Sequence, residues 1–218
     1  MEKNIKVLIG CEESQTITIA FRKLGIEAYS CDLQDCSGGY PEWHLKMDVF
    51  QAIDLIKPTL GIFHPPCDFL SKAGARWMYP TKGNVCQIRL NRALNARDFF
   101  MRCLNSKIPF IAVENPMPLR IVNLPKPNDV VQPYQHGHPF SKKTYLWLKN
   151  LPPLMHTNFI SEYKPFMPSN TGGKKRGQKA TFVNISKKDS SKTFTGIAEA
   201  MAVQWSDFIF KTEGINCL

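Results

Sequence analysis

The sequence predicts an α/β protein built on a doubly wound, mostly parallel sheet. Continuous apolar runs alternate along the chain with segments of helical spacing, which is the pattern of β-α-β units. Two of the runs, at residues 60–64 and 109–113, are followed closely by polar side chains and proline, which predicts buried strands with functional groups at their carboxyl ends. The length of 218 residues suits one core, so we expect a single three-layer domain over residues 1–218.

The first strand–helix–strand unit is predicted over residues 5–31. An apolar run at residues 5–10 predicts a buried strand, and residues 16–24 have the apolar spacing of an amphipathic helix that stops at Gly25. Residues 26–31 predict a second strand, parallel to the first.

The turn after the first strand and the acid after the second strand indicate a cofactor site. Asp32 stands where nucleotide-type folds hold an acid that accepts hydrogen bonds from ribose hydroxyls. The turn runs Gly10-Cys11-Glu12-Glu13-Ser14 and lacks the glycine-rich fingerprint that cradles a pyrophosphate. Because two glutamates there would repel phosphates, we expect a cofactor without phosphates, such as S-adenosylmethionine with its positive sulfonium.

Cys67 follows a short helix, predicted at residues 50–56, and an apolar strand. The run Leu60-Gly61-Ile62-Phe63 continues into His64-Pro65-Pro66-Cys67, and Ser71 comes four residues later. Prolines cannot donate to a sheet and pre-set a turn, so the strand should end at His64 and present the thiol just past its carboxyl end. Ligands bind there in open α/β sheets, which makes Cys67 a candidate nucleophile. A half-buried, inert cysteine after a proline-terminated strand is the alternative.

Glu114 ends the next predicted strand in the same way. Residues 87–104 predict an amphipathic helix, and the strand at residues 109–113 runs into Glu114-Asn115-Pro116. Because the tips of parallel strands lie on the same edge of a sheet, we expect Glu114 and Cys67 to converge. A loop or helix-terminal carboxylate is the alternative role for Glu114.

The later part of the chain is rich in loops. Residues 118–193 hold many prolines and show little periodicity, apart from a basic turn at Ser141-Lys142-Lys143 that enters a strand. A final helix is predicted to begin at Thr195 and to return to the core.

The charge balance favours a polyanionic partner, nucleic acid first. The formal net charge is +10, and Lys174-Lys175-Arg176 form one basic cluster, for which a solvated loop is the alternative. Arg76 and Trp77 belong to a basic, aromatic and irregular segment at residues 71–85. That segment is suited to cover the site or to enter a nucleic-acid groove, and a loop packed by Trp77 is the alternative.

Composition indicates the compartment. No apolar run has membrane-spanning length, the first residues lack the pattern of a cleavable signal peptide, and the seven cysteines have no zinc-site spacing. Free thiols favour a reducing environment, so we expect a cytoplasmic protein with no membrane partner and no metal. The sequence does not indicate an oligomeric state.

A cysteine and a carboxyl group at neighbouring strand tips suit addition to a pyrimidine. Carbon 5 of cytosine is a poor nucleophile, and a thiolate that adds at carbon 6 converts the ring to an enamine in which carbon 5 is reactive. A carboxyl group kept protonated by burial would donate to ring nitrogen 3 and stabilise the addition. A nearby basic residue would help to keep Cys67 ionised.

Two motifs resemble those of the DNA cytosine-5 methyltransferases. Pro65-Pro66-Cys67 with Ser71 resembles the catalytic motif of that family, and Glu114-Asn115 resembles its Glu-Asn motif, in the same order and with agreeing spacing. The resemblance implies a Rossmann-like class I methyltransferase fold, S-adenosylmethionine as cofactor, double- or single-stranded DNA as substrate, and Cys67 as the nucleophile with Glu114 as its acid.

The resemblance also implies roles for less specific positions. Asp32 resembles the ribose-binding acid, Asp48 the residue that meets the adenine ring, and Gly196 the glycine of the C-terminal motif. Lys143 stands roughly where the family has an arginine that contacts the base. The cofactor site so implied also takes in Gly10, Cys11, Glu12 and Pro65, and the implied substrate contacts are Ser71, Arg76, Trp77, Asn115, Lys142, Lys174, Lys175 and Arg176.

The chain departs from the family pattern in several places. The Phe-x-Gly-x-Gly cofactor loop and the Gln-x-Arg-x-Arg motif are absent, Ile197 replaces an asparagine, and residues 118–193 stand in for a large target-recognition domain. This compact form is similar to small phage or prophage members, which implies a bacterial or phage-infected host cell, short-site or low-specificity methylation, and a link to restriction-modification.

Three other functions stay open. The substrate could be a free cytosine nucleotide, since little recognition domain remains. The chain could be a non-enzymatic module that binds nucleic acid or a host protein. An amino-methyltransferase is disfavoured by His64 and Cys67, because those enzymes have an acidic or polar residue before Pro-Pro and an aromatic residue after it.

Overall fold

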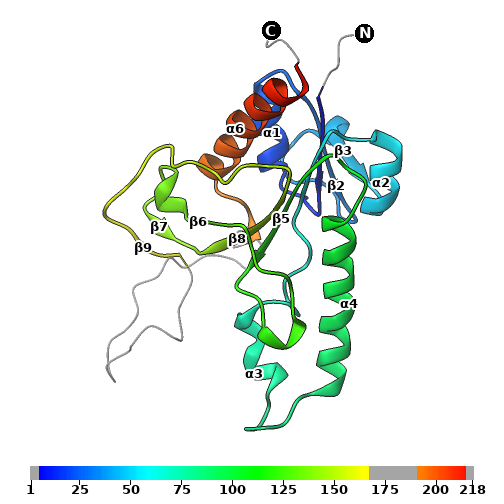
Figure 1. Ribbon diagram of the computed structural model, residues 1–218, viewed down its shortest axis with the longest axis vertical. Coiled ribbons are helices and arrows are strands. Elements are labelled where there is room, and N and C mark those ends of the chain that lie inside the picture. The colour runs from blue at the N-terminus through cyan, green and yellow to red at the C-terminus, as the bar shows by residue number, and fades with distance from the viewer. Residues whose placement is uncertain (1–4, 167–190, 215–218) are drawn as a thin grey trace.

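One mostly parallel sheet forms the middle layer of the protein, with helices on both faces (Figure 1). The computed structural model describes residues 5–166 and 191–214. The strands of the sheet are β1 (Lys6–Gly10), β2 (Glu27–Asp32), β3 (His44–Lys46), β4 (Leu60–Phe63), β5 (Phe110–Pro116), β6 (Asp129–Val131) and β8 (Thr144–Lys149). The helices are α1 (Thr16–Lys23), α2 (Val49–Ile56), α3 (Ala75–Met78), α4 (Gln87–Leu104) and α6 (Thr195–Glu213).

The order of the strands is β3-β2-β1-β4-β5-β8-β6. Strands β1 to β5 pair in parallel, and β8 is antiparallel to both β5 and β6. A small parallel pair joins β7 (Phe140–Ser141) to β9 (Lys164–Pro165). Short 3₁₀ turns lie at Pro41–Trp43, Lys72–Gly74, Arg120–Val122 and Pro133–Gln135. The predicted α/β class with a Rossmann-like, mostly parallel sheet is therefore confirmed.

Each face of the sheet carries its own hydrophobic core. Val7 and Ile9 of β1 face α1 and α6, where Trp205 is fully buried. Leu8 points the other way, into a second core that Phe100 of α4 and the buried residues of α2 help to fill. Burial on both faces explains why the strands are continuous apolar runs instead of alternating ones.

Three elements differ from the prediction. Strand β5 continues through Glu114 and Pro116, because β8 pairs with it as far as Thr144. The segment at residues 71–85 contains the short helix α3. Residues 118–193 supply β6 and β8 to the main sheet, so part of that range belongs to the central fold.

In residues 5–166 and 191–214, no helix combines the length and the apolar composition needed to cross a bilayer. The cysteines of those two ranges are free thiols.

Candidate active site

A cleft of about 670 Å³ opens at the carboxyl ends of β1, β4 and β5. The topology predicts a ligand site at this edge, because the parallel strands all end there. Its lining includes Cys11, Glu12, Asp32, His64, Pro65, Cys67, Glu114 and Lys142. The structure thus brings Cys67 and Glu114 into one cleft, as expected from the two strand tips.

A tight turn holds Cys67 just past β4. The backbone nitrogen of Ser71 donates to the Cys67 carbonyl oxygen at 2.9 Å. The backbone nitrogen of Leu119 donates to the Leu70 carbonyl oxygen at 2.7 Å, so the loop after β5 fastens this turn. The position of the thiol relative to Glu114 is therefore fixed by backbone hydrogen bonds between the two loops that carry them.

The thiol of Cys67 is protonated in the resting protein. Burial raises the pKa of Cys67 to about 11, and the negative charges of Glu114 and Asp68 act in the same direction. Lys142 opposes this rise, because a nearby cation favours the thiolate. The thiol therefore needs a neighbouring group to take its proton before it can act as a nucleophile at neutral pH.

His64 and Glu114 form a hydrogen-bonded pair across neighbouring strands. Because Phe63 of β4 lies opposite Val113 of β5, the next residues on each strand, His64 and Glu114, are also neighbours. The Nδ1 atom of His64 lies 3.1 Å from Oε2 of Glu114, and both side chains are largely shielded from solvent.

The Glu114 carboxyl is ionised at rest, contrary to the expectation that burial keeps it protonated. Burial does raise the pKa of Glu114, but the hydrogen bond and charge of His64, together with the charge of Lys142, more than offset it. The net pKa is below the ordinary value for glutamate. The sequence-based expectation was wrong on this point because it considered burial without the partner on the adjacent strand.

Lys142, not Lys143, is the lysine at the cleft. Lys142 lines the cleft and acts on both Cys67 and Glu114. The Nζ atom of Lys143 lies 5.7 Å from the ring centre of Tyr145, and Lys143 is not among the lining residues. The expected cation is thus present but belongs to the preceding residue of the turn.

The turn between β1 and α1 keeps an unusual backbone without glycines. Cys11 and Gln15 adopt positive φ angles of 60° and 58°, which non-glycine residues seldom do. Between them the buried Glu12 folds back onto the start of α1. Its Oε1 accepts from the nitrogen of Ile17 at 2.6 Å, and its Oε2 accepts from the Thr18 hydroxyl at 2.8 Å. A carboxyl group of the chain itself therefore occupies this helix terminus, and burial raises its pKa despite these hydrogen bonds.

A second hollow, of about 440 Å³, adjoins the cleft and shares Cys11, Asp32, Gln34 and Pro66 with it. Its walls are mainly apolar, with Met47, Val49, Ala96 and Phe99 among them, and the carboxylates of Asp32 and Asp48 line its edge. A slot with apolar walls and acidic groups suits a nucleoside, whose base packs between side chains while its ribose hydroxyls donate to a carboxylate. These residues fit the adenosine part of S-adenosylmethionine.

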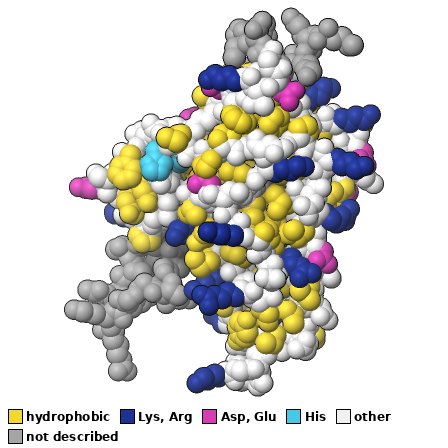
Figure 2. Space-filling model, in the orientation of Figure 1, with side chains coloured by type: hydrophobic (Ala, Val, Ile, Leu, Met, Phe, Trp, Pro, Cys, Tyr) yellow, Lys and Arg dark blue, Asp and Glu magenta, His cyan; other side chains and the backbone are white. Residues whose placement is uncertain are grey.

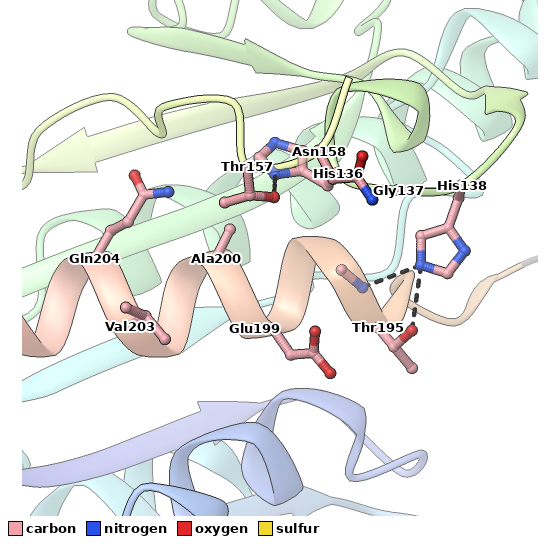
Figure 3. A pocket seen from close by; sticks show the side chains of 11 residues that line it. His136, Gly137, His138, Thr157, Asn158, Thr195, Glu199, Ala200, Val203 and Gln204 are labelled. Carbon is pink, nitrogen blue, oxygen red and sulfur yellow. Dashed lines mark hydrogen bonds between the residues drawn. The ribbon is translucent and has the colours of Figure 1, made fainter. Parts of the chain in front are cut away.

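Two glycines assigned to the cofactor site have packing roles. A Cβ atom on Gly10 would lie 2.5 Å from Cγ2 of Val49. A Cβ atom on Gly196 would overlap the carbonyl oxygen of His136. Gly196 lines a separate hollow of about 530 Å³ between α6 and residues 136–138 and 157–158 (Figure 3). There Nε2 of His138 accepts from the Gly196 nitrogen at 3.1 Å.

The remaining predicted residues lie outside the cleft. Ser71 and Asn115 are buried and do not line it. Trp77 in α3 is 58% exposed, with the Arg76 guanidinium 4.5 Å from its ring centre. Figure 2 shows Lys and Arg side chains spread over one face of the molecule, with fewer Asp and Glu side chains among them. The basic cluster Lys174, Lys175 and Arg176 lies outside the described residues.

Sequence reasoning did not assign a role to His64, to the carboxylate of Glu12 as a helix cap, or to Arg89. The Nη2 atom of Arg89 donates to the carbonyl oxygen of Asp68 at 2.7 Å, so α4 also holds the residue after the thiol. Of these three residues, only His64 could have been singled out from the sequence, since it directly precedes Pro65 at the strand tip. In residues 5–166 and 191–214, no group of three or more His, Cys, Asp or Glu side chains is arranged to hold a metal ion.

A scan against protein-family models gives no match, and a search of curated proteins gives none. Among solved structures, the methyltransferase EhMeth of Entamoeba histolytica matches 74% of this chain and 57% of its own, with 14% identity and a TM-score of 0.44. A triple mutant of Spodoptera frugiperda DNMT2 follows with 74% and 58% coverage, 13% identity and a TM-score of 0.42. The Dnmt2 methyltransferase of S. pombe has 74% and 52% coverage, 16% identity and a TM-score of 0.39.

The chain thus spans little more than half the length of each of these proteins. Identities and TM-scores are low, and the assignment of the fold rests on the strand order and strand directions of this protein itself.

Proposed function

We propose that the protein is an S-adenosylmethionine-dependent methyltransferase that acts on carbon 5 of cytosine in DNA through a covalent Cys67 adduct. The observation that carries this proposal is the meeting of a thiol and a hydrogen-bonded carboxylate in one cleft at the ends of β4 and β5. That pair of groups is what addition to carbon 6 of a pyrimidine requires.

The side chains divide the chemistry between them. Cys67 forms the bond to carbon 6, Glu114 faces nitrogen 3 and carries a proton to it, and Lys142 places a positive charge beside both groups. Asp32, Asp48 and the apolar slot would hold the adenosine part of the cofactor. When bound, S-adenosylmethionine supplies the methyl group that carbon 5 accepts.

The Glu12 cap supports a cofactor without phosphates. Its carboxyl group fills the helix terminus where a dinucleotide would place its pyrophosphate, so a phosphate there would meet a buried oxygen pair instead of free N–H donors.

The basic surface supports a nucleic-acid substrate. The net charge of +10 attracts a polyanion, and the exposed Trp77 beside Arg76 offers a surface on which a base can stack. A cytosine within a strand would have to be turned out of its stack to reach Cys67 at the strand tip.

The experiment that tests this function is covalent trapping. The protein is incubated with S-adenosylmethionine and an oligonucleotide containing 5-fluorocytosine, in single- and double-stranded form, and adducts are counted on a denaturing gel. We expect an adduct that requires the cofactor. After methyl transfer the enzyme is released when carbon 5 loses its proton, and fluorine in place of that hydrogen blocks this step. Cys67→Ala should abolish it, and Cys36→Ala, a half-buried cysteine that does not line the cleft, should not.

Two further measurements distinguish this function from a nucleotide methyltransferase and from a non-enzymatic binding module. An adduct with 5-fluorodeoxycytidine monophosphate but with neither oligonucleotide would identify a nucleotide substrate. Binding of DNA with no adduct, and no heat on titration with S-adenosylmethionine, would identify a binding module and contradict the proposal.

A further inference from the structure

The imidazole of His64 contacts one acidic side chain of the cleft directly and acts on a second one by its charge. Its Nδ1 atom donates to Oε2 of Glu114 at 3.1 Å. Its charge also acts on the buried carboxyl of Glu12, which comes from the turn after β1. The backbone of His64 is held as well, since its nitrogen donates to the carbonyl oxygen of Gly10 at 3.0 Å.

The hydrogen-bonding pattern defines which ring nitrogen carries the proton toward Glu114. Nε2 of His64 is buried and has no hydrogen-bond partner within residues 5–166 and 191–214. A proton on Nδ1 has an acceptor at 3.1 Å, whereas a proton on Nε2 has none, so Nδ1 is the ring nitrogen that donates to Glu114. The ring therefore presents its hydrogen-bonding nitrogen to Glu114.

We propose that His64 is a positioning residue that holds Glu114 as an oriented carboxylate, so that Glu114 takes the proton of Cys67 and delivers it to nitrogen 3 of the cytosine. This inference rests on the proposed function and extends it to a residue that the sequence motifs leave without a role.

The addition step needs no external acid or base, because one proton passes from Cys67 to Glu114 and then to nitrogen 3. The Cys67 S–H bond breaks, and its proton passes to the Glu114 carboxylate. The sulfur lone pair forms the bond to carbon 6, the carbon 5–carbon 6 π pair moves to carbon 4–carbon 5, and the nitrogen 3–carbon 4 π pair moves to nitrogen 3. That nitrogen takes the proton from Glu114, which returns to its carboxylate form. A carboxyl group protonated at rest could donate to nitrogen 3 but could not accept the thiol proton.

The charged and titratable groups around the pair come from several elements. Glu12 follows β1, Cys67 and Asp68 follow β4, and Lys142 precedes β8. Glu13, Asp32 and Lys192 also line the cleft. Loss of His64 leaves the burial of Glu114 in place but removes the hydrogen bond that offsets it, so the pKa of Glu114 should rise.

The test compares His64→Ala with His64→Asn in the full chain. The amide nitrogen of asparagine reaches about where Nδ1 lies and can still donate to Oε2. The first measurement is the titration of the Glu114 carboxyl carbon by NMR in protein labelled at glutamate, assigned from the Glu114→Gln spectrum. We expect the midpoint to move to higher pH in His64→Ala and to return part of the way in His64→Asn.

The second measurement is the pH dependence of adduct formation with the 5-fluorocytosine oligonucleotide. His64→Ala should form the adduct about 10- to 100-fold more slowly at neutral pH, with the acidic limb of the profile displaced upward, and His64→Asn should recover much of the rate. An unchanged Glu114 midpoint, or an unchanged pH profile alongside a displaced midpoint, would overturn the proposal. If the wild-type protein forms no adduct but the midpoint moves as described, the proposed methylation fails while the positioning of Glu114 by His64 stands.

Discussion

The Oε1 atom of Glu12 lies 2.6 Å from the backbone nitrogen of Ile17 at the start of α1. A side chain four residues before the helix thus satisfies N–H groups that a helix terminus leaves without partners. The nitrogen and hydroxyl of Thr18 bind the other oxygen, Oε2. The turn that replaces a glycine-rich loop is consequently fastened to α1, and its buried acid has a structural role.

Replacement of Glu12 should destabilise the protein. Glu12→Ala leaves the donors of Ile17 and Thr18 without their acceptor, and we expect a loss of about 2 kcal/mol in the free energy of unfolding. Glu12→Gln keeps one acceptor oxygen and should cost about 1 kcal/mol. Urea denaturation measures both, with Glu42→Ala, at an exposed position, as the control with little effect. Equal stability of Glu12→Ala and the wild type would show that the cap contributes nothing.

Alkylation of Cys67 should depend steeply on pH. Its pKa is raised to about 11, so the thiolate fraction, and with it the rate of reaction with iodoacetamide, should climb about tenfold per pH unit below that value. Glu114→Gln removes a negative charge that disfavours the thiolate, so its curve should move to lower pH. Mass spectrometry of the Cys67 peptide follows the rate. A plateau already reached near neutral pH would contradict the buried, acid-flanked environment of the thiol.

The neighbouring lysines should behave differently. Lys142 lowers the pKa of both Glu114 and Cys67, so Lys142→Met should shift alkylation of Cys67 to higher pH and slow adduct formation about 2- to 5-fold. Lys143→Met is the matched control, because Lys143 lies over the ring of Tyr145 instead. Equal effects of the two substitutions, in parallel alkylation and trapping assays, would show that only the overall charge matters.

Gly196 should not tolerate a side chain. A Cβ atom there would overlap the His136 carbonyl oxygen, so Gly196→Ala must push α6 away from residues 136–138. We expect a loss of about 1–3 kcal/mol in the free energy of unfolding, measured by urea denaturation. Val203→Ala, at a half-exposed position of the same helix, should change it by less than about 0.5 kcal/mol. A stable Gly196→Ala protein would mean that the two segments are not in contact in solution.

The strands and long helices follow from local pattern. The runs at residues 5–10 and 60–64, and the helix at residues 87–104, appear in the structure nearly as their sequences predict. Buried parallel strands need unbroken apolar runs, so they leave a strong signal. Strand β6 leaves only a weak signal in the sequence. Its three residues form a strand because they pair with β8, which lies elsewhere along the chain.

The sequence by itself determined that a thiol and a carboxylate would stand at neighbouring strand tips, because apolar strands and proline turns are coded locally. Only the tertiary structure decided the charge state of those groups. The pKa of Cys67 depends on burial, on Glu114 and on Lys142, and the pKa of Glu114 depends on burial, on His64 and on Lys142. Strand pairing and loop packing bring these groups to the cleft. Electrostatic interactions act through space, so the order of residues along the chain does not reveal them.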